Sequence, residues 1–399
     1  MEIKRDVYLD RLIVRKHNGL IKVITGIRRS GKSYLLNTLF YRHLIAENIS
    51  EDHIIKFAFD SAEDLLKIGG DPIVLDDEKE DRKVDPSKFI NWLMPQIKGG
   101  DMYYLLLDEV QKLGAFESVL NGFLRRENLD VYVTGSNSKF LSKDILTEFR
   151  GRGDEVHVLP LSFSEYYAFK QGDKSEAYDD YSVYGGLPAV ALMVTEEQKT
   201  NYLISQMQNL YLRDIVNRYA VQDETALGEV IDVIAFGIST LTNPRKIANT
   251  MNTIHGTKTC DATVDRYIGY AEEAFILTRV KRYNVKGRKY IGTPYKIYFE
   301  DVGLRNARLS FRQIEGTHMM ENIIYNELRY RGYQVDVGTV ESREKDSSGK
   351  EIRVQREIDF IASLGSKKYY IQSAYSLPDE AKRTQEIRPF RKIDDSFKK

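Results

Sequence analysis

The stretch that most constrains this chain is residues 26–33, which read GIRRSGKS. It follows an apolar run, residues 21–24, and leads into a helical pattern over residues 34–40. This spacing is that of a P-loop, in which backbone amides at a helix N-terminus surround phosphate groups. The alternative is a glycine-containing strand-to-helix turn that matches by chance. The strand before the loop and the helix after it favour the P-loop.

The loop predicts a nucleotide site with a defined role for several of its side chains. Lys32 is expected to reach the β- and γ-phosphates, and the Ser33 hydroxyl is expected to ligate Mg²⁺. ATP is favoured as the nucleotide because no guanine-reading N/T-K-x-D pattern is apparent. The predicted nucleotide-binding residues are Gly26, Ile27, Arg28, Arg29, Ser30, Gly31, Lys32, Ser33 and Tyr34.

A second anchor is residues 103–109, which read YYLLLDE. A continuous apolar run is typical of a strand buried on both faces of a parallel sheet. Its two terminal acids fall at the carboxyl edge, where open α/β sheets bind ligands. We expect Asp108 to hold Mg²⁺ through water, and Glu109 to orient or deprotonate the attacking water. Glu109 could instead cap the following helix, but adjacent acids at such a place are costly without a cation or water.

Four further side chains are candidates for a role in hydrolysis. If the strand at residues 131–134 lies between the other two, Ser136 or Asn137 after it can sense the γ-phosphate, although both residue types also suit a turn. Arg150 and Arg152 lie beside glycines and could be offered to a γ-phosphate, in cis or from a neighbouring subunit. Surface ion pairing is the alternative for these arginines.

Composition narrows the class of protein. At 399 residues the chain should hold two or three domains. Lys+Arg and Asp+Glu both number 59, so net charge gives no sign of a nucleic-acid partner. The single cysteine, Cys260, excludes an intrachain disulfide. No segment approaches the ~20 apolar residues of a membrane helix. We expect a soluble cytoplasmic protein that does not contact a membrane.

With residues 149–166 (FRGRGDEVHVLPLSFSEY) added to these motifs, the chain resembles a prokaryotic AAA+-like family. Its members join an N-terminal ATPase domain to a C-terminal domain of unknown function. Other similar segments are residues 184–188, 211–216, 298–305, 321–328 and 357–360. The resemblance implies an ASCE-type sheet with Lys32, Ser33, Asp108 and Glu109 as the nucleotide site. It also makes Arg150 or Arg152 the arginine finger.

The middle of the chain, residues 223–299, suggests three helices and two strands in the order of a winged helix. Residues 276–296 carry seven basic side chains and no acidic one, interleaved with tyrosines. This segment could contact DNA phosphates. The alternative is a winged helix that serves as a lid or interdomain support.

The C-terminal part resembles a PD-(D/E)XK nuclease core, whose acids and E-x-K triplet hold a divalent ion and position water. Glu321 and Asp359 fit the first two places, but the triplet reads Gln372-Ser373-Ala374. A carboxylate and a lysine are therefore missing, which predicts a non-cleaving domain. Residues 341–355 suggest a charged loop. The chain also stops earlier than expected for the family, so its C-terminus is truncated or the last strand is absent.

We therefore predict an α/β protein with a P-loop NTPase parallel sheet, a helical and winged-helix region, and a nuclease-like α/β domain. The expected domains are residues 1–165, 166–310 and 311–399. The expected function is Mg²⁺-dependent ATP hydrolysis that controls the later domains. The alternatives are an ATP-switched DNA-binding or DNA-processing protein, and a signalling or defence scaffold with little turnover. We also expect the chain to associate with copies of itself as a homo-oligomer.

Overall fold

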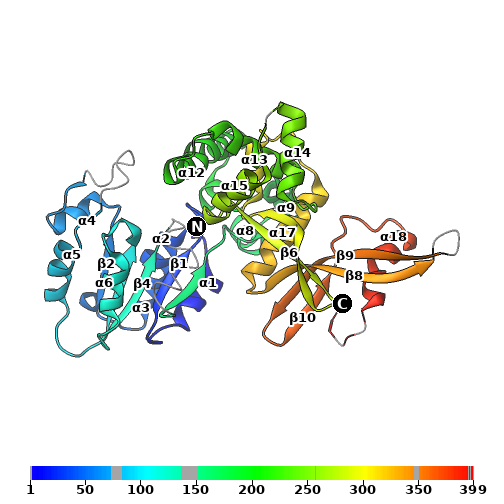
Figure 1. Cartoon of the computed structure of the whole chain (residues 1–399). Coiled ribbons are helices and arrows are strands. Elements are labelled where there is room, and N and C mark those ends of the chain that lie inside the picture. Colours follow the sequence, from blue (N-terminus) through cyan, green and yellow to red (C-terminus); the bar gives the residue numbers. More distant parts are fainter. Residues whose placement is uncertain are drawn as a thin grey trace. The chain divides into compact units, whose positions relative to one another are not determined.

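The computed structural model describes residues 2–72, 83–135, 151–256, 258–345, 350–393, 395 and 397–398. The chain divides into two compact units, Met1–Leu159 and Pro160–Lys399 (Figure 1). The expected boundary at residue 165 lies close to this division, whereas the expected boundary at residue 310 falls inside the second unit. In the described parts of the chain, no helix has both the length and the apolar character needed to cross a bilayer.

The first unit is built on a five-stranded parallel sheet in the order β2-β3-β4-β1-β5 (Figure 1). In chain order the strands are β1 (Ile21–Thr25), β2 (Ile54–Ala58), β3 (Tyr103–Asp108), β4 (Leu129–Thr134) and β5 (Gly153–His157). Every residue of β1, β3 and β4 is buried, as their apolar runs predict. The predicted α/β class is confirmed, and β4 does lie between the P-loop strand and the strand that ends in two acids.

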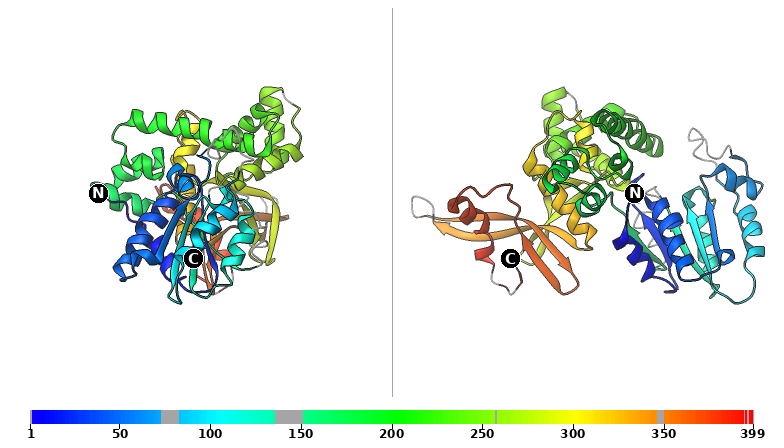
Figure 2. Two further views of the ribbon diagram at one scale, coloured as in Figure 1. Left: turned by 90° about the vertical axis from the view of Figure 1, so that its left-hand side faces the viewer. Right: turned by 180° about the vertical axis from the view of Figure 1, so that it is seen from behind.

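Helices cover both faces of this sheet (Figure 2). On one face, Phe57 of β2 packs against Phe89 and Trp92 with ring centroids 5.1 Å apart in each pair. On the other face, Phe40 contacts Tyr132 of β4 at 4.5 Å. The helices are α1 (Asp6–Ile13), α2 (Lys32–Tyr34), which continues through a π-helical stretch (Leu35–Phe40) into α3 (Tyr41–Ala46), α4 (Ala62–Lys67), α5 (Pro86–Leu93) and α6 (Phe116–Phe123).

The second unit begins with helices and ends in a mixed sheet of order β10-β9-β8-β6-β7. The helices are α8 (Phe163–Lys170), α9 (Lys174–Tyr184), α10 (Pro188–Leu192), α11 (Glu196–Ser205), a π-helical stretch (Gln206–Leu212), α12 (Arg213–Tyr219), α13 (Glu224–Phe236), α14 (Pro244–His255), α15 (Asp261–Glu273), α16 (Val302–Arg308), α17 (Gly316–Tyr330) and α18 (Glu380–Ile387). The strands are β6 (Leu277–Asn284), β7 (Lys289–Phe299), β8 (Gln334–Lys345), β9 (Glu351–Leu364) and β10 (Lys367–Ile371).

One sheet therefore contains both the hairpin that follows α15 and the strands of the C-terminal part. β6 pairs with β7 in antiparallel fashion and with β8 in parallel fashion. Thr242, between α13 and α14, forms an isolated bridge with Tyr295 of β7. The hairpin thus has β8 on one edge and a short bridge on the other.

The prediction of a charged loop over residues 341–355 is wrong. Residues 341–345 and 351–355 extend β8 and β9 into a two-stranded ribbon whose register runs from Glu341↔Gln355 to Lys345↔Glu351 (Figure 1). Glu341 pairs with Arg353 across the ribbon, and Arg343 pairs with Glu351 at 3.7 Å. The charges that suggested a loop are therefore cross-strand partners.

Two of the family-like segments meet in the core of the second unit. Asp301 caps α16 by accepting from Leu304 N (3.0 Å), and its other oxygen accepts from Gly186 N (2.7 Å). A Cβ on Gly185 would overlap the Asp301 carboxylate, and one on Gly303 would overlap the Tyr184 carbonyl. The close packing of these two segments therefore explains why positions 185 and 303 are occupied by glycine.

Candidate functional site

The P-loop has the backbone that its two glycines predict. Gly26 has φ 135° and Gly31 has φ 94°, and Gly31 is the N-cap of α2. A Cβ on Gly26 would overlap the carbonyl oxygen of Val158. The loop therefore lies directly against the residue that follows β5, and only glycine fits there.

Lys32 is the buried cation of this loop. Its Nζ donates to the carbonyl oxygens of Gly26 and Ile27, each at 3.0 Å. Ser33, one residue further along α2, is exposed. Tyr34 donates its hydroxyl to Glu2 at 2.8 Å, so it contacts the N-terminal segment.

Asp108, at the end of β3, is the centre of the polar contacts beside the loop. Its Oδ1 accepts from Ser33 Oγ (3.1 Å) and from Thr134 Oγ1, and its Oδ2 accepts from Asn37 Nδ2 (3.1 Å). Burial raises the pKa of Asp108, the Thr134 hydrogen bond opposes this, and the charge of Glu109 adds to it. A nearby cation would stabilise the ionised form of a buried carboxyl group whose pKa is raised in this way.

Glu109 lies beside this carboxylate in a constrained backbone conformation. It has φ 50°, and its amide donates to Thr134 Oγ1 at 3.1 Å. Its Oε2 accepts from Gln111 Nε2. A third acid, Asp60, follows β2 at the same edge, and its pKa is raised first by partial desolvation and then by the charge of Glu109.

These residues fit ATP and Mg²⁺ on their chemistry. Loop amides, a helix N-terminus and the Lys32 ammonium suit phosphate oxygens. Hydroxyl and carboxylate oxygens from Ser33 and Asp108, 3.1 Å apart, are the donor types that Mg²⁺ prefers. The two predicted Mg²⁺ ligands are thus brought together, beside the predicted Lys32 and Glu109.

Of the other predicted catalytic residues, Arg152 is the one that the structure describes, and it does not lie at this edge. Asn137, its alternative Ser136, and Arg150 lie outside the described residues. Arg152 is exposed and directly precedes β5, where its carbonyl accepts from Ile21 N at 2.9 Å. Because β5 is parallel to β1 and five residues long, Arg152 lies about 16 Å from the carboxyl edge of its own sheet.

Two residues that contact Asp108 were not predicted. Thr134, the last residue of β4, contacts both Asp108 and Glu109, and Asn37 of the helix after the loop contacts Asp108. Thr134 could have been found, because it is a polar residue at the carboxyl end of a central strand. Asn37 could not, since a polar residue inside a helical pattern is commonplace.

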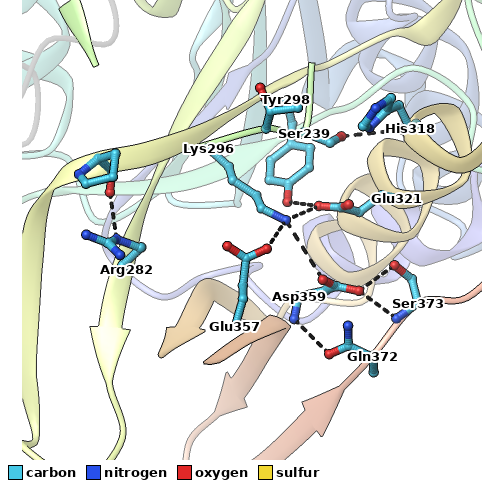
Figure 3. Close-up of polar contacts among 12 residues, drawn as sticks. Ser239, Arg282, Lys296, Tyr298, His318, Glu321, Glu357, Asp359, Gln372 and Ser373 are labelled. Atoms are coloured by element: carbon cyan, nitrogen blue, oxygen red, sulfur yellow. Dashed lines mark hydrogen bonds and ion pairs between the residues drawn. The ribbon is translucent and has the colours of Figure 1, made fainter. Parts of the chain in front are cut away.

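A second cluster of charge lies in the other unit, around the ammonium of Lys296 on β7 (Figure 3). The side chain is 4% exposed, and Nζ lies 2.8 Å from Glu321 Oε1, 2.6 Å from Glu357 Oε1 and 3.8 Å from Asp359 Oδ1. Burial alone would lower the pKa of Lys296, but these three carboxylates raise it. Tyr298 also donates to Glu321, at 2.6 Å.

The residues expected to fit the nuclease resemblance are thus brought together, with an added cation. Asp359 Oδ2 accepts from Ser373 N (2.8 Å) and Ser373 Oγ (2.7 Å), and Asp359 N donates to Gln372 Oε1 at 3.4 Å. Among the residues that the structure describes, no three or more carboxylate, imidazole or thiol groups are placed to hold a metal ion.

The basic segment, residues 276–296, is less basic at its surface than its sequence suggests. Besides Lys296, Arg279 pairs with Asp265 and Glu272, both at 2.5 Å. Arg282 is buried and donates to the carbonyls of Thr293 and Pro294. The four remaining basic side chains are exposed: Lys281, Lys286, Arg288 and Lys289.

Comparisons with known proteins agree with the first unit's fold. A family profile described as an AAA domain matches residues 18–167, and one described as a domain of unknown function (DUF8612) matches residues 175–315. An uncharacterized protein of Haemophilus influenzae is 33% identical over 404 residues, which cover 100% of this chain and 92% of that protein. An uncharacterized protein of Methanocaldococcus jannaschii is 26% identical over 409 residues (98% and 81%).

Among solved structures, the Walker-type ATPase of Pyrococcus abyssi is similar with a TM-score of 0.52 and 15% identity, covering 77% of this chain and 96% of that one. This likeness concerns the fold. The AAA match supports a P-loop ATPase domain of the AAA+ type. Neither of these two family matches extends beyond residue 315, so they lend no support to the nuclease resemblance, which rests on Glu321 and Asp359.

Proposed function

The chain belongs to the same family as the uncharacterized Haemophilus influenzae protein, and its residues 18–167 match an AAA domain. From this premise we propose that its first unit binds ATP with Mg²⁺ and hydrolyses it. One observation carries this proposal. The hydroxyls of Ser33 and Thr134, from the P-loop helix and β4, both donate to the carboxylate of Asp108 on β3, next to Lys32. Three separate elements thus converge on one oxygen-rich point beside a phosphate-binding loop.

In this proposal the residues act by positioning and charge neutralisation. Lys32 exchanges its loop carbonyl partners for phosphate oxygens, and the loop amides hold the β-phosphate. Glu109, held by Gln111 and by its own amide bond to Thr134, orients the attacking water and accepts its proton. Mg²⁺, when bound at Ser33 and Asp108, supplies neutralisation of phosphate charge.

We extend the proposal to the regulation and assembly of the chain. Nucleotide state in the first unit alters the second unit, and the protein acts in the cytoplasm, where ATP is available. Because Arg152 lies at the opposite edge of its own sheet, an arginine finger from this residue requires a second copy of the chain.

We also propose that the second unit serves as an interdomain support or in assembly of the protein, and that it does not cleave DNA. Helices α13 to α15 and the β6–β7 hairpin, with the Thr242–Tyr295 bridge, have the order of a winged helix. Its α15 carries acids at the surface, including Asp261 and Glu273, which would repel phosphates. In the nuclease-like part, the Lys296 ammonium neutralises the acids that a nuclease would use for a metal ion.

The test of the ATPase proposal separates binding from turnover. Lys32→Ala should abolish binding of a fluorescent ATP analogue, because in this proposal the buried ammonium contacts the phosphates directly. Glu109→Gln should keep binding and lose turnover by about 100-fold or more, the usual contribution of a positioned proton acceptor. Both are measured by fluorescence titration and by phosphate release with Mg²⁺.

Glu127→Gln is the matched control, since Glu127 is exposed and precedes β4 at the other edge of the sheet. It makes the same change of charge and should keep wild-type turnover. Undiminished hydrolysis by the Glu109→Gln protein would remove Glu109 from the mechanism. Failure of the wild-type chain to bind ATP would remove the function itself.

A further inference from the structure

A buried arginine near the N-terminus joins the P-loop to the last residue of the first unit. Arg5, which directly precedes α1, is 2% exposed. Its NH1 donates to the carbonyl of Ser30 in the loop at 3.0 Å. Its NH2 donates to the carbonyl of Leu159 at 2.6 Å. One rigid guanidinium fork therefore spans the phosphate loop and the point where the chain leaves the unit.

The exit segment, Val158 and Leu159, has further ties to the same place. Val158 N donates to Thr25 O at 2.8 Å, and Val158 O faces the Cα of Gly26 so closely that a Cβ would not fit. Leu159 N donates to the hydroxyl of Tyr8 at 3.0 Å, and the Arg5 guanidinium lies 4.7 Å from the centre of the Tyr8 ring. The exit segment thus packs against the first glycine of the loop and, through Arg5, against its fifth residue.

We propose that Arg5 is a positioning residue that couples the conformation of the phosphate loop to the exit segment, and so to the chain that continues at Pro160. The inference rests on the proposed nucleotide site. Phosphate oxygens would compete with the carbonyls of Gly26 and Ile27 for the Lys32 ammonium. A loop that releases these carbonyls changes the peptide groups around Ser30, whose carbonyl Arg5 holds.

The buried guanidinium makes this coupling obligatory. When a buried donor loses its acceptor, the folded state is destabilised by most of that donor's desolvation free energy, and the destabilisation is larger when the donor is charged. Arg5 therefore either moves with the Ser30 carbonyl, in which case the Leu159 carbonyl must shift as well, or holds that carbonyl in place and opposes the change in the loop. Beyond the junction, Leu161 N donates to Gly186 O at 2.7 Å, so the chain is held again within two residues.

Hydrogen exchange of the full-length chain, with and without Mg²⁺-ATPγS, tests the proposal. The amides of Val158, Leu159 and Leu161 are all hydrogen-bonded, so their exchange reports the junction. In the wild type, nucleotide should change their exchange rates by about tenfold. Arg5→Met should lose most of that change while its affinity for a fluorescent ATP analogue stays within about threefold of wild type.

Arg15→Met is the matched control: Arg15 lies just after α1 but pairs with Asp154 at 2.9 Å, away from the loop, and should keep the nucleotide response. If Arg5→Met does not fold, Arg5→Lys takes its place, because one ammonium keeps the charge but does not reproduce the fork. A full response in either Arg5 variant, or no response in a wild type that binds ATPγS, overturns the coupling. A wild type that does not bind ATPγS overturns the proposed nucleotide site instead.

Discussion

At the scale of single residues, Lys296 shows how one contact changes the chemistry of a whole cluster. Removing the ammonium would leave Glu321 and its neighbours as buried anions with no cation, and an unpaired buried charge costs several kcal/mol. Nothing local in the sequence predicts this contact, because Lys296 lies 25 residues from Glu321 along the chain. In contrast, Lys32 and Ser33 are predictable, since the P-loop is one continuous segment.

Lys296→Met tests the role of the ammonium as the cluster's own cation. We expect the free energy of unfolding at pH 7.5 to fall by about 3–5 kcal/mol, whereas Lys281→Met, on an exposed residue of the same segment, should change it by less than about 0.5 kcal/mol. Burial already raises the pKa of Glu321, and loss of Lys296 raises it further. A raised carboxyl pKa costs stability as pH rises through it, so the deficit of the variant should shrink at lower pH.

Denaturant unfolding at several pH values measures both effects, and Mn²⁺ provides an independent check. Wild-type unfolding of the second unit should be insensitive to Mn²⁺, because Lys296 fills the cation position of this cluster. In Lys296→Met the freed carboxylates should gain stability from Mn²⁺. Stabilisation of the wild type by Mn²⁺ at this cluster would contradict the role given to Lys296.

At the scale of elements, the buried strands were predicted well and the exposed ribbon was not. β1, β3 and β4 are fully buried, so their apolar runs are a direct signal. The side chains described in the outer part of the β8–β9 ribbon are exposed or half-buried, and the ribbon is held by pairing between the two strands. That pairing depends on a partner strand and leaves no pattern within one segment. The pairing of β6 with β8 was missed for the same reason.

At the same scale we predict the effect of removing Asp301, which caps α16 and accepts a hydrogen bond from the backbone amide of Gly186. At pH 7, Asp301→Ala should lower the free energy of unfolding by about 2–4 kcal/mol, the sum of a lost N-cap and a buried donor left unsatisfied. Asp379→Ala is the control: Asp379 caps α18 in the same way but is exposed, so it should cost about 1 kcal/mol. Chemical denaturation of both variants supplies the comparison, and equal losses would show that burial of the Asp301 cap adds nothing.

The same residue gives a pH dependence with a defined sign. Burial raises the pKa of Asp301 from its ordinary value of 3.8 to about 6. The folded state therefore binds the proton more tightly, so stability falls as pH rises from about 4 to about 6 and this contribution is flat above that range. Asp301→Ala should lack this slope, which unfolding at pH 4.5 and pH 7 would show.

At the scale of the whole molecule, the net charge of +0 does not predict whether the chain binds DNA, so binding depends on local basic surface. The fold pairs or buries several of the basic side chains that would form this surface. Of the seven basic residues in the segment 276–296, Arg279, Arg282 and Lys296 are held by acids or backbone carbonyls. The sequence shows that basic residues cluster in this segment, but it does not show which of them are paired. Apart from the backbone carbonyls of the hairpin, their partners come from other helices and strands.

We therefore expect the full chain to bind duplex DNA no more tightly than non-specific binding, with a dissociation constant of about 10⁻⁴–10⁻⁶ M at physiological salt. Within residues 276–296, four exposed basic side chains remain to contact phosphates, Lys281, Lys286, Arg288 and Lys289, and the surface acids of the neighbouring α15 oppose them. If all four side chains made contacts, log K would fall with log salt with a slope of about −3.6. A fluorescence-anisotropy titration across salt measures this slope, with and without Mg²⁺-ATP. Tight binding with that slope, lost when the four residues are changed to glutamine, would overturn the supporting role given to the hairpin and restore it as a DNA-contacting wing.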